Sequence, residues 1–140
     1  MASVREFRES LLDEEVLFQV VALGQSVYIW IGNDERRMDA LAVGVPPAPS
    51  AARQIPSGST LFATSADGAS QGLATRLTRR FGRAVFVSLN LRDDPDIRLF
   101  AEKHAVEALK ALGPPDGANG ATNGVEPATV ADTRAAAAPL

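Results

Sequence analysis

Two adjacent segments rich in β-branched and aromatic residues constrain the fold of this chain most strongly. They span residues 15–23 and 26–31, and only Gly24 and Gln25 separate them. A glycine at the first of two loop positions favours a type II′ turn, whose twist matches that of the flanking strands. We therefore predict a β-hairpin over residues 15–31.

The register of this hairpin divides its side chains between two unlike faces, because successive residues of a strand point to opposite sides. One face is apolar, and its cross-strand pairs are Ala22 with Val27, Val20 with Ile29, and Phe18 with Ile31. The other face is mixed and carries Leu17, Gln19, Val21, Tyr28 and Trp30. Tyrosine and tryptophan are enriched at the centres of protein interfaces, so the mixed face is a candidate contact surface.

Four further strands are predicted. They are a short edge strand at residues 4–8 and strands at 41–45, 59–63 and 84–89. In the last strand Val85, Val87 and Leu89 share one face, whereas Phe86 and Ser88 share the other. Four prolines between residues 44 and 58 predict a long surface loop.

Two helices follow from apolar residues at helical spacing. The first is expected after Asp67, its cap, with Leu73, Leu77 and Phe81 as the buried stripe and Gly82 as its end. The second is expected to start at Asp94 and Pro95 and to end at Gly113. Its inner face is Ile97, Phe100, Ala101, Ala105, Ala108 and Leu112.

This element order predicts an α+β fold, with a mostly antiparallel sheet of five to six strands and two helices on one face. The other face of the sheet would expose a large half-apolar surface, which on a monomer usually marks an interaction site. The residues that we expect at this interface are Gln19, Val21, Tyr28, Trp30 and Phe86.

The composition of the chain changes after residue 112. Alanine, glycine and proline make up more than half of residues 113–140, and few larger apolar residues occur there. Such a segment cannot bury enough surface to offset the entropy lost on ordering. We predict one folded domain over residues 1–112 and a disordered tail over 113–140.

Charge and composition argue against several classes of protein. The net charge of −3 argues against a dedicated nucleic-acid binder, which usually has a basic excess. The apolar stretch at 16–31 is short and interrupted by polar residues, which argues against a membrane protein. The first residues lack the apolar core of a secretory signal. We therefore expect a cytoplasmic protein that is small enough to enter the nucleus.

Few residues are of the types that act in catalysis or bind metals and cofactors. Cysteine is absent and His104 is the one histidine, so imidazole clusters and thiolate sites are excluded. The glycine-rich stretch at 65–72 lies where phosphate loops lie, but it lacks both phosphate-binding fingerprints. Asp93, Asp94 and Asp96 suit a helix start better than a calcium loop. We expect no catalytic residue, no metal and no cofactor.

Four arginines gather around the end of the first helix: Arg76, Arg79, Arg80 and Arg83. They could form a basic patch for an acidic partner surface. They could equally be a solvated helix face, whose positive charges favour the helix C-terminus.

Four blocks in order resemble the proteasome assembly chaperone 4 family. They are FQVVAL at 18–23, VYIWIG at 27–32, DGASQGLATRL at 67–77 and VFVSLNL at 85–91, and the likeness extends over about residues 7–112. The resemblance implies a non-enzymatic protein that pairs with proteasome assembly chaperone 3, with the sheets of the two subunits packed together. It also implies a role in assembling the α-subunit ring of the 20S proteasome, for which the arginine cluster would be a candidate contact.

Two other classes stay open at this point. One is a small protein-interaction scaffold of the longin or profilin type, with a similar sheet but a different partner. The other is a small hydrolase or nucleotide binder that uses the loop between Gly68 and Gly72.

Overall fold

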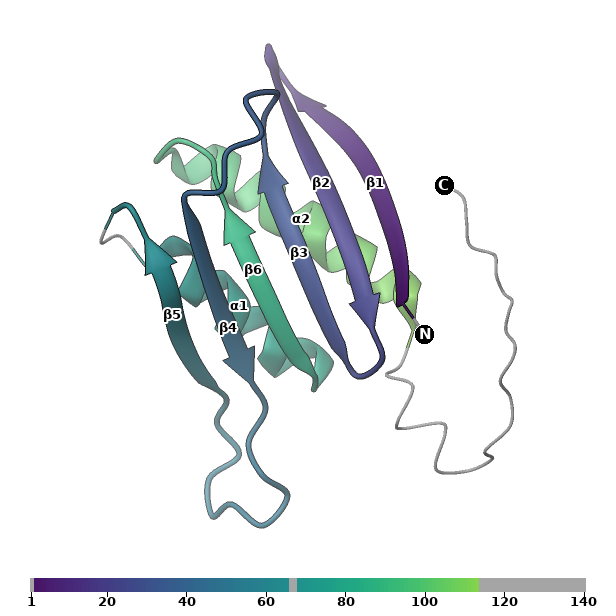
Figure 1. Ribbon diagram of the computed structural model, residues 1–140, viewed down its shortest axis with the longest axis vertical. Coiled ribbons are helices and arrows are strands. Elements are labelled where there is room, and N and C mark those ends of the chain that lie inside the picture. Colours follow the sequence, from purple (N-terminus) through teal and green to yellow (C-terminus); the bar gives the residue numbers. More distant parts are fainter. Residues whose placement is uncertain (1, 66–67, 114–140) are drawn as a thin grey trace.

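A six-stranded sheet and two helices form the two layers of this chain (Figure 1). The computed structural model describes residues 2–65 and 68–113. The elements in chain order are β1 (Ala2–Leu11), β2 (Glu14–Leu23), β3 (Ser26–Gly32), β4 (Ala40–Val45), β5 (Ser57–Ala63), α1 (Ala69–Phe81), β6 (Ala84–Leu89) and α2 (Pro95–Leu112). Both helices lie behind the sheet in the view of Figure 1.

The strand order is β1-β2-β3-β6-β4-β5. The chain forms β1, β2 and β3 as neighbours, then the β4–β5 hairpin, and returns through α1 to place β6 between β3 and β4. The β3–β6 pairing is parallel, and the other four strand pairings are antiparallel. The predicted α+β fold, a mostly antiparallel sheet with two helices on one face, is confirmed.

The hairpin at Gly24 has the predicted register. Val20 lies opposite Ile29, and Ala22 lies opposite Val27. A type II′ turn requires a positive φ at the first of its two central residues only. Gly24, the first, has a φ of 63°, and Gln25, the second, has a negative φ. The apolar face of the hairpin points toward the helices, where its members join the core.

The core lies between the sheet and the helices and is almost entirely aliphatic. Its strand members include Val16, Phe18, Val20, Val27, Ile29, Ile31, Ala42, Val85 and Val87, and its helix members include Leu73, Leu77, Ala101, Ala105 and Leu109. Helix α1 packs very close to β4, because Gly44 has no side chain. A Cβ at Gly44 would lie 2.5 Å from both the Ala74 carbonyl oxygen and the Thr78 Oγ1.

The second helix begins as predicted. Asp94 is the N-cap of α2, and its carboxylate accepts hydrogen bonds from the backbone N–H of Asp96 and Ile97. Pro95 occupies the first turn, and Gly113 follows the last. These features confirm the expected boundaries of the second helix.

The start of the first helix differs from the prediction. The residue before α1 is Gly68, with a φ of 68°, and it has no side chain with which to cap the helix. The N-cap position is thus one residue beyond the predicted cap, Asp67, which itself lies outside the described residues. The predicted end at Gly82 is confirmed, because its N–H donates to the Thr78 carbonyl.

Strand β1 is longer than the sequence indicated. It spans ten residues, not the five of the predicted edge strand, because it pairs with β2 along its whole length. The loop that contains the prolines projects from one end of the sheet (Figure 1). The predicted tail lies outside the described residues beyond Gly113. Among the residues described, no helix has both the length and the apolarity needed to cross a membrane.

Candidate partner-binding face

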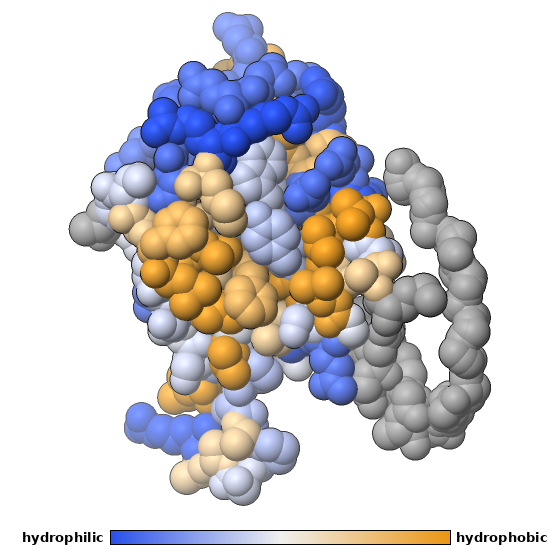
Figure 2. All heavy atoms as spheres, in the orientation of Figure 1, coloured by the Kyte–Doolittle hydropathy of each residue, from blue (hydrophilic) through white to orange (hydrophobic). Residues whose placement is uncertain are grey.

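The face of the sheet opposite the helices is uncovered by any element within residues 2–65 and 68–113 (Figures 1 and 2). We call it the open face. A continuous row of side chains crosses all six strands at its centre, because each member lies directly opposite the next. The row is Val4, Val21, Tyr28, Phe86, Val43 and Ser59.

Figure 2 shows apolar side chains on both sides of a paler central column, with hydrophilic residues gathered toward one end. Several large apolar side chains on the open face are strongly exposed; they are Val4, Leu23, Val45 and Phe62. Single exposed apolar residues are ordinary, but a contiguous group of them marks a contact surface.

The open face includes the residues predicted for an interface. Gln19, Val21, Tyr28 and Trp30 lie on it from β2 and β3, and Phe86 joins them from β6. All five are partly exposed. The structure thus brings these candidates together on one surface.

Ser88, which shares the Phe86 face of β6, does not extend the exposed surface. Ser88 is fully buried, and its hydroxyl donates to the Ala40 carbonyl at 2.6 Å. The Asn90 side chain donates to the same hydroxyl at 2.9 Å. Because β4 packs beside β6, Ser88 ties these two strands together and does not face solvent.

Sequence reasoning missed the contribution of β4 and β5. Leu41 and Val43 lie on the open face, and Phe62 lies opposite Leu41. The alternation of Leu41, Val43 and Val45 with smaller residues was the available signal. The position of β4 beside β6, however, depends on a long-range pairing.

Trp30 is held in place by two contacts. Its indole N–H donates to the Arg37 carbonyl at 2.9 Å. Its ring lies across Gly32, where a Cβ would approach the ring to 2.5 Å. The indole N–H therefore has its hydrogen-bond partner within the chain, and these two contacts fix the position of the ring.

Tyr28 lies beside Val21 and Phe86 near the centre of the face. Burial raises the pKa of the Tyr28 phenol above its ordinary value of 10.0, because a partly desolvated site disfavours the charged phenolate. The phenol is therefore neutral at physiological pH.

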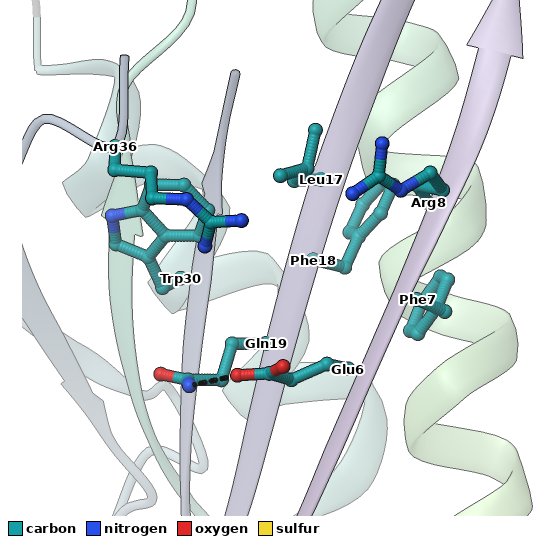
Figure 3. Close-up of a pocket in the computed structure, with 8 residues that line it drawn as sticks. All are labelled: Glu6, Phe7, Arg8, Leu17, Phe18, Gln19, Trp30 and Arg36. Carbon is teal, nitrogen blue, oxygen red and sulfur yellow. Dashed lines mark hydrogen bonds between the residues drawn. The ribbon is translucent and has the colours of Figure 1, made fainter. Parts of the chain in front are cut away.

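A hollow of about 390 Å³ lies at the end of the open face near β1 and β2 (Figure 3). Its walls include Glu6, Arg8, Leu17, Gln19, Trp30 and Arg36. The Gln19 amide donates to the Glu6 carboxylate at 2.7 Å at one side of this hollow.

The four arginines of the predicted basic patch do not form one surface. Arg76 makes a bidentate pair with Glu102 of α2, with a shortest distance of 2.8 Å. Arg79 and Arg80 are exposed in the last turn of α1. Arg83 is buried, and its guanidinium donates to the carbonyls of Gly24 and Gly113. The inclusion of Arg83 as a surface contact is wrong, because it is a structural residue.

The other candidate sites have structural roles. Ser70, at the start of α1, is buried and its hydroxyl accepts from the Leu89 N–H. His104 packs against the rings of Phe18 and Phe100, with Glu9 3.8 Å from its Nδ1. Among the described residues no group of three or more histidine, cysteine, aspartate or glutamate side chains could hold a metal ion.

Comparisons with known proteins bear on this surface. The family model of proteasome assembly chaperone 4 matches residues 15–91. Human proteasome assembly chaperone 4 is 33% identical over 111 residues, which are 79% of this chain and 87% of the human protein. The chain belongs to the proteasome assembly chaperone 4 family. The mouse protein of the same name is equally similar, at 33% identity over the same coverage.

A solved structure shares the fold. One chain of the crystal structure of a chaperone complex for yeast 20S proteasome assembly superposes with a TM-score of 0.62 and 16% identity. The match covers 79% of this chain and 96% of that chain. The part matched by the proteasome assembly chaperone 4 family model runs from β2 to the end of β6, so it includes most of the open face.

Proposed function

We propose that this chain is a non-enzymatic chaperone that pairs with a proteasome assembly chaperone 3-like subunit and promotes assembly of the 20S proteasome α-subunit ring. The pairing takes place on the open face, where a sheet of the partner packs against this sheet. The observation that carries the proposal is the row from Val4 to Ser59, which crosses all six strands without a covering layer. Membership of the proteasome assembly chaperone 4 family supports it.

Sheet-on-sheet packing suits this surface. Two sheets that pack face to face interdigitate apolar side chains from their inner faces. The centre of the row is apolar and aromatic, with Val21, Tyr28 and Phe86 in adjacent strands. Burial of these side chains supplies the main driving force for association, because apolar surface is removed from water.

Three of the polar groups around this centre are already paired. Trp30 donates to the Arg37 carbonyl, Gln19 donates to Glu6, and Arg8 pairs with Glu15 at 2.9 Å. A partner can therefore cover them at low cost, since buried polar groups that keep their hydrogen bonds are not orphaned.

Arg79 and Arg80 are the candidates for contact with an α-subunit. Both are exposed on α1, in the layer behind the sheet, so a partner on the open face leaves them accessible (Figure 1). Arg76 is a weaker candidate because Glu102 already neutralises it.

Affinity purification of the tagged full chain from its own cells tests the proposed function. The expected result is recovery of the proteasome assembly chaperone 3-like subunit together with proteasome α-subunits. Recovery of GTPases or actin without proteasome proteins would instead support the longin-like or profilin-like alternative.

The double variant Arg79→Glu/Arg80→Glu separates the two contacts in the same experiment. It should retain the partner chaperone and lose the α-subunits. The matched control is Lys103→Glu/Lys110→Glu on the exposed side of α2, which should retain both. Equal recovery of α-subunits with both double variants would exclude the arginines as the contact. The cytoplasmic and nuclear location stays a prediction, which microscopy of the tagged chain would check.

A further inference from the structure

We propose that the hollow beside Trp30 receives an aspartate or glutamate side chain of the partner subunit, and that Arg36 is the residue that binds it. This inference rests on the proposed function, because the partner is the subunit that covers the open face. It adds a specificity determinant to that function: one acidic residue of the partner, at a fixed place in the interface.

The hollow has an apolar floor and two basic sides. Leu17 is only 6% exposed and lies in the hollow, and Trp30 is fixed by its hydrogen bond to the Arg37 carbonyl. The guanidinium groups of Arg8 and Arg36 lie on opposite sides of Leu17 in Figure 3. Once the partner covers the open face, a group between them would be removed from water, which strengthens its interaction with charge.

The charged side chains that line the hollow differ in whether they have a partner. Glu6 accepts a hydrogen bond from Gln19, and Arg8 pairs with Glu15. Arg36 makes no side-chain hydrogen bond or ion pair with any residue in the described part of the chain. Arg36 is thus the one charged side chain lining the hollow that has no hydrogen-bond or ion-pair partner among the described residues.

A carboxylate is the chemical group that best fits such a site. The planar guanidinium presents its N–H donors as a rigid fork that matches the two oxygens of a carboxylate. Arg36 would repel an ammonium or a second guanidinium, and an apolar side chain would leave Arg36 covered without a partner, which is costly.

The backbone of Arg36 lies in a turn that glycine could also occupy. Its φ is 56°, in the left-handed region that arginine rarely adopts. The turn that holds it is built on Asn33, whose carbonyl accepts from the Arg36 N–H at 2.9 Å and whose side chain accepts from the Glu35 N–H at 3.0 Å. Glycine would adopt this conformation at lower cost. Glycine at position 36 is therefore compatible with this turn.

The test measures binding of the full chain to the purified partner chaperone by calorimetry at low and moderate salt. Arg36→Glu should weaken the Kd at least about tenfold, and more at low salt. Arg36→Lys keeps the positive charge but loses the forked guanidinium. Its Kd should lie between those of the unchanged chain and Arg36→Glu. The matched control is Arg53→Glu in the proline-containing loop, which is exposed and should bind like the unchanged chain.

Arg36→Gly keeps the test independent of folding. Its Tm should not fall, because glycine accepts the left-handed backbone, while its affinity for the partner should fall about tenfold. The acidic residues on the partner's sheet face should then be changed to lysine one at a time. One of these partner variants should bind Arg36→Glu again. A loss of affinity that no reversal restores would overturn the assignment of a paired carboxylate.

The outcomes separate this inference from the proposed function. If Arg36→Glu binds as tightly as the unchanged chain while Val21→Glu does not bind, the inference is wrong and the proposed function stands. If the unchanged chain does not bind the partner chaperone, the proposed function is contradicted and the inference falls with it.

Discussion

The indole ring of Trp30 lies across the backbone of Gly32, two residues further along the same face of β3. A Cβ at position 32 would lie 2.5 Å from Cζ2 and 2.7 Å from Cη2 of the ring, closer than side chains pack. This contact gives a physical reason for the Trp-Ile-Gly sequence at 30–32. The glycine lets the ring pack against the strand backbone, and the ring lines the hollow on the open face.

We predict that Gly32→Ala displaces the Trp30 ring and lowers the free energy of unfolding by about 1–3 kcal/mol, the usual cost of overpacking. Trp30 is the single tryptophan, so its fluorescence emission reports the displacement directly. In a Trp30→Ala background the same substitution should cost much less, which a double-mutant cycle by urea denaturation measures. Equal costs in both backgrounds would contradict the contact.

Arg83 should be important for stability and not for surface binding. It is 6% exposed and donates to the Gly24 carbonyl at 3.1 Å and to the Gly113 carbonyl at 3.2 Å. Arg83→Met should therefore destabilise the chain by about 2–3 kcal/mol, because hydrogen bonds from a charged donor are lost in a buried site. The control Arg79→Met, on an exposed helix position, should change stability by less than about 0.5 kcal/mol.

Tyr28 should titrate at a higher pH than a free tyrosine. It is the single tyrosine, so absorbance at the phenolate band follows this residue alone. Burial raises its pKa in the folded chain above 10.0. The resulting contribution to stability is complete below the unfolded pKa and is lost as the pH rises through the folded pKa. A midpoint at or below 10.0 in the folded chain would contradict the burial of this ring.

The hairpin and its two faces could be predicted from sequence because they depend on local information. Gly24 fixes the turn, the turn fixes the register, and the register places Val20 and Val21 on opposite faces. The start of α2 could be predicted for the same reason, because Asp94 and Pro95 are adjacent in sequence to the helix that they begin.

The rest of the fold depends on residues distant in sequence. The parallel pairing of β6 with β3, and the placing of Val43 beside Phe86, result from the return of the chain through α1. The burial of Ser88 follows from that placing, because its hydroxyl partner is the Ala40 carbonyl. The burial of Arg83 could not be predicted from its neighbours in sequence. The Gly24 and Gly113 carbonyls that it binds lie 59 and 30 residues away.

The variant Val21→Glu tests whether the open face binds the partner chaperone. Val21 is the second residue of the row, between Val4 and Tyr28, and its side chain points away from the core. A charge there reaches water in the free chain but would be buried without a partner in the complex, at a cost of several kcal/mol.

The adjacent residue supplies the matched control. Val20 is 2% exposed and faces the helices, so Val20→Glu should unfold the chain. Circular dichroism measures the fold of each variant, and calorimetry measures binding to the purified partner chaperone. We expect Val21→Glu to keep its fold and to lose binding. Binding as tight as that of the unchanged chain, or unfolding like that of Val20→Glu, would contradict it.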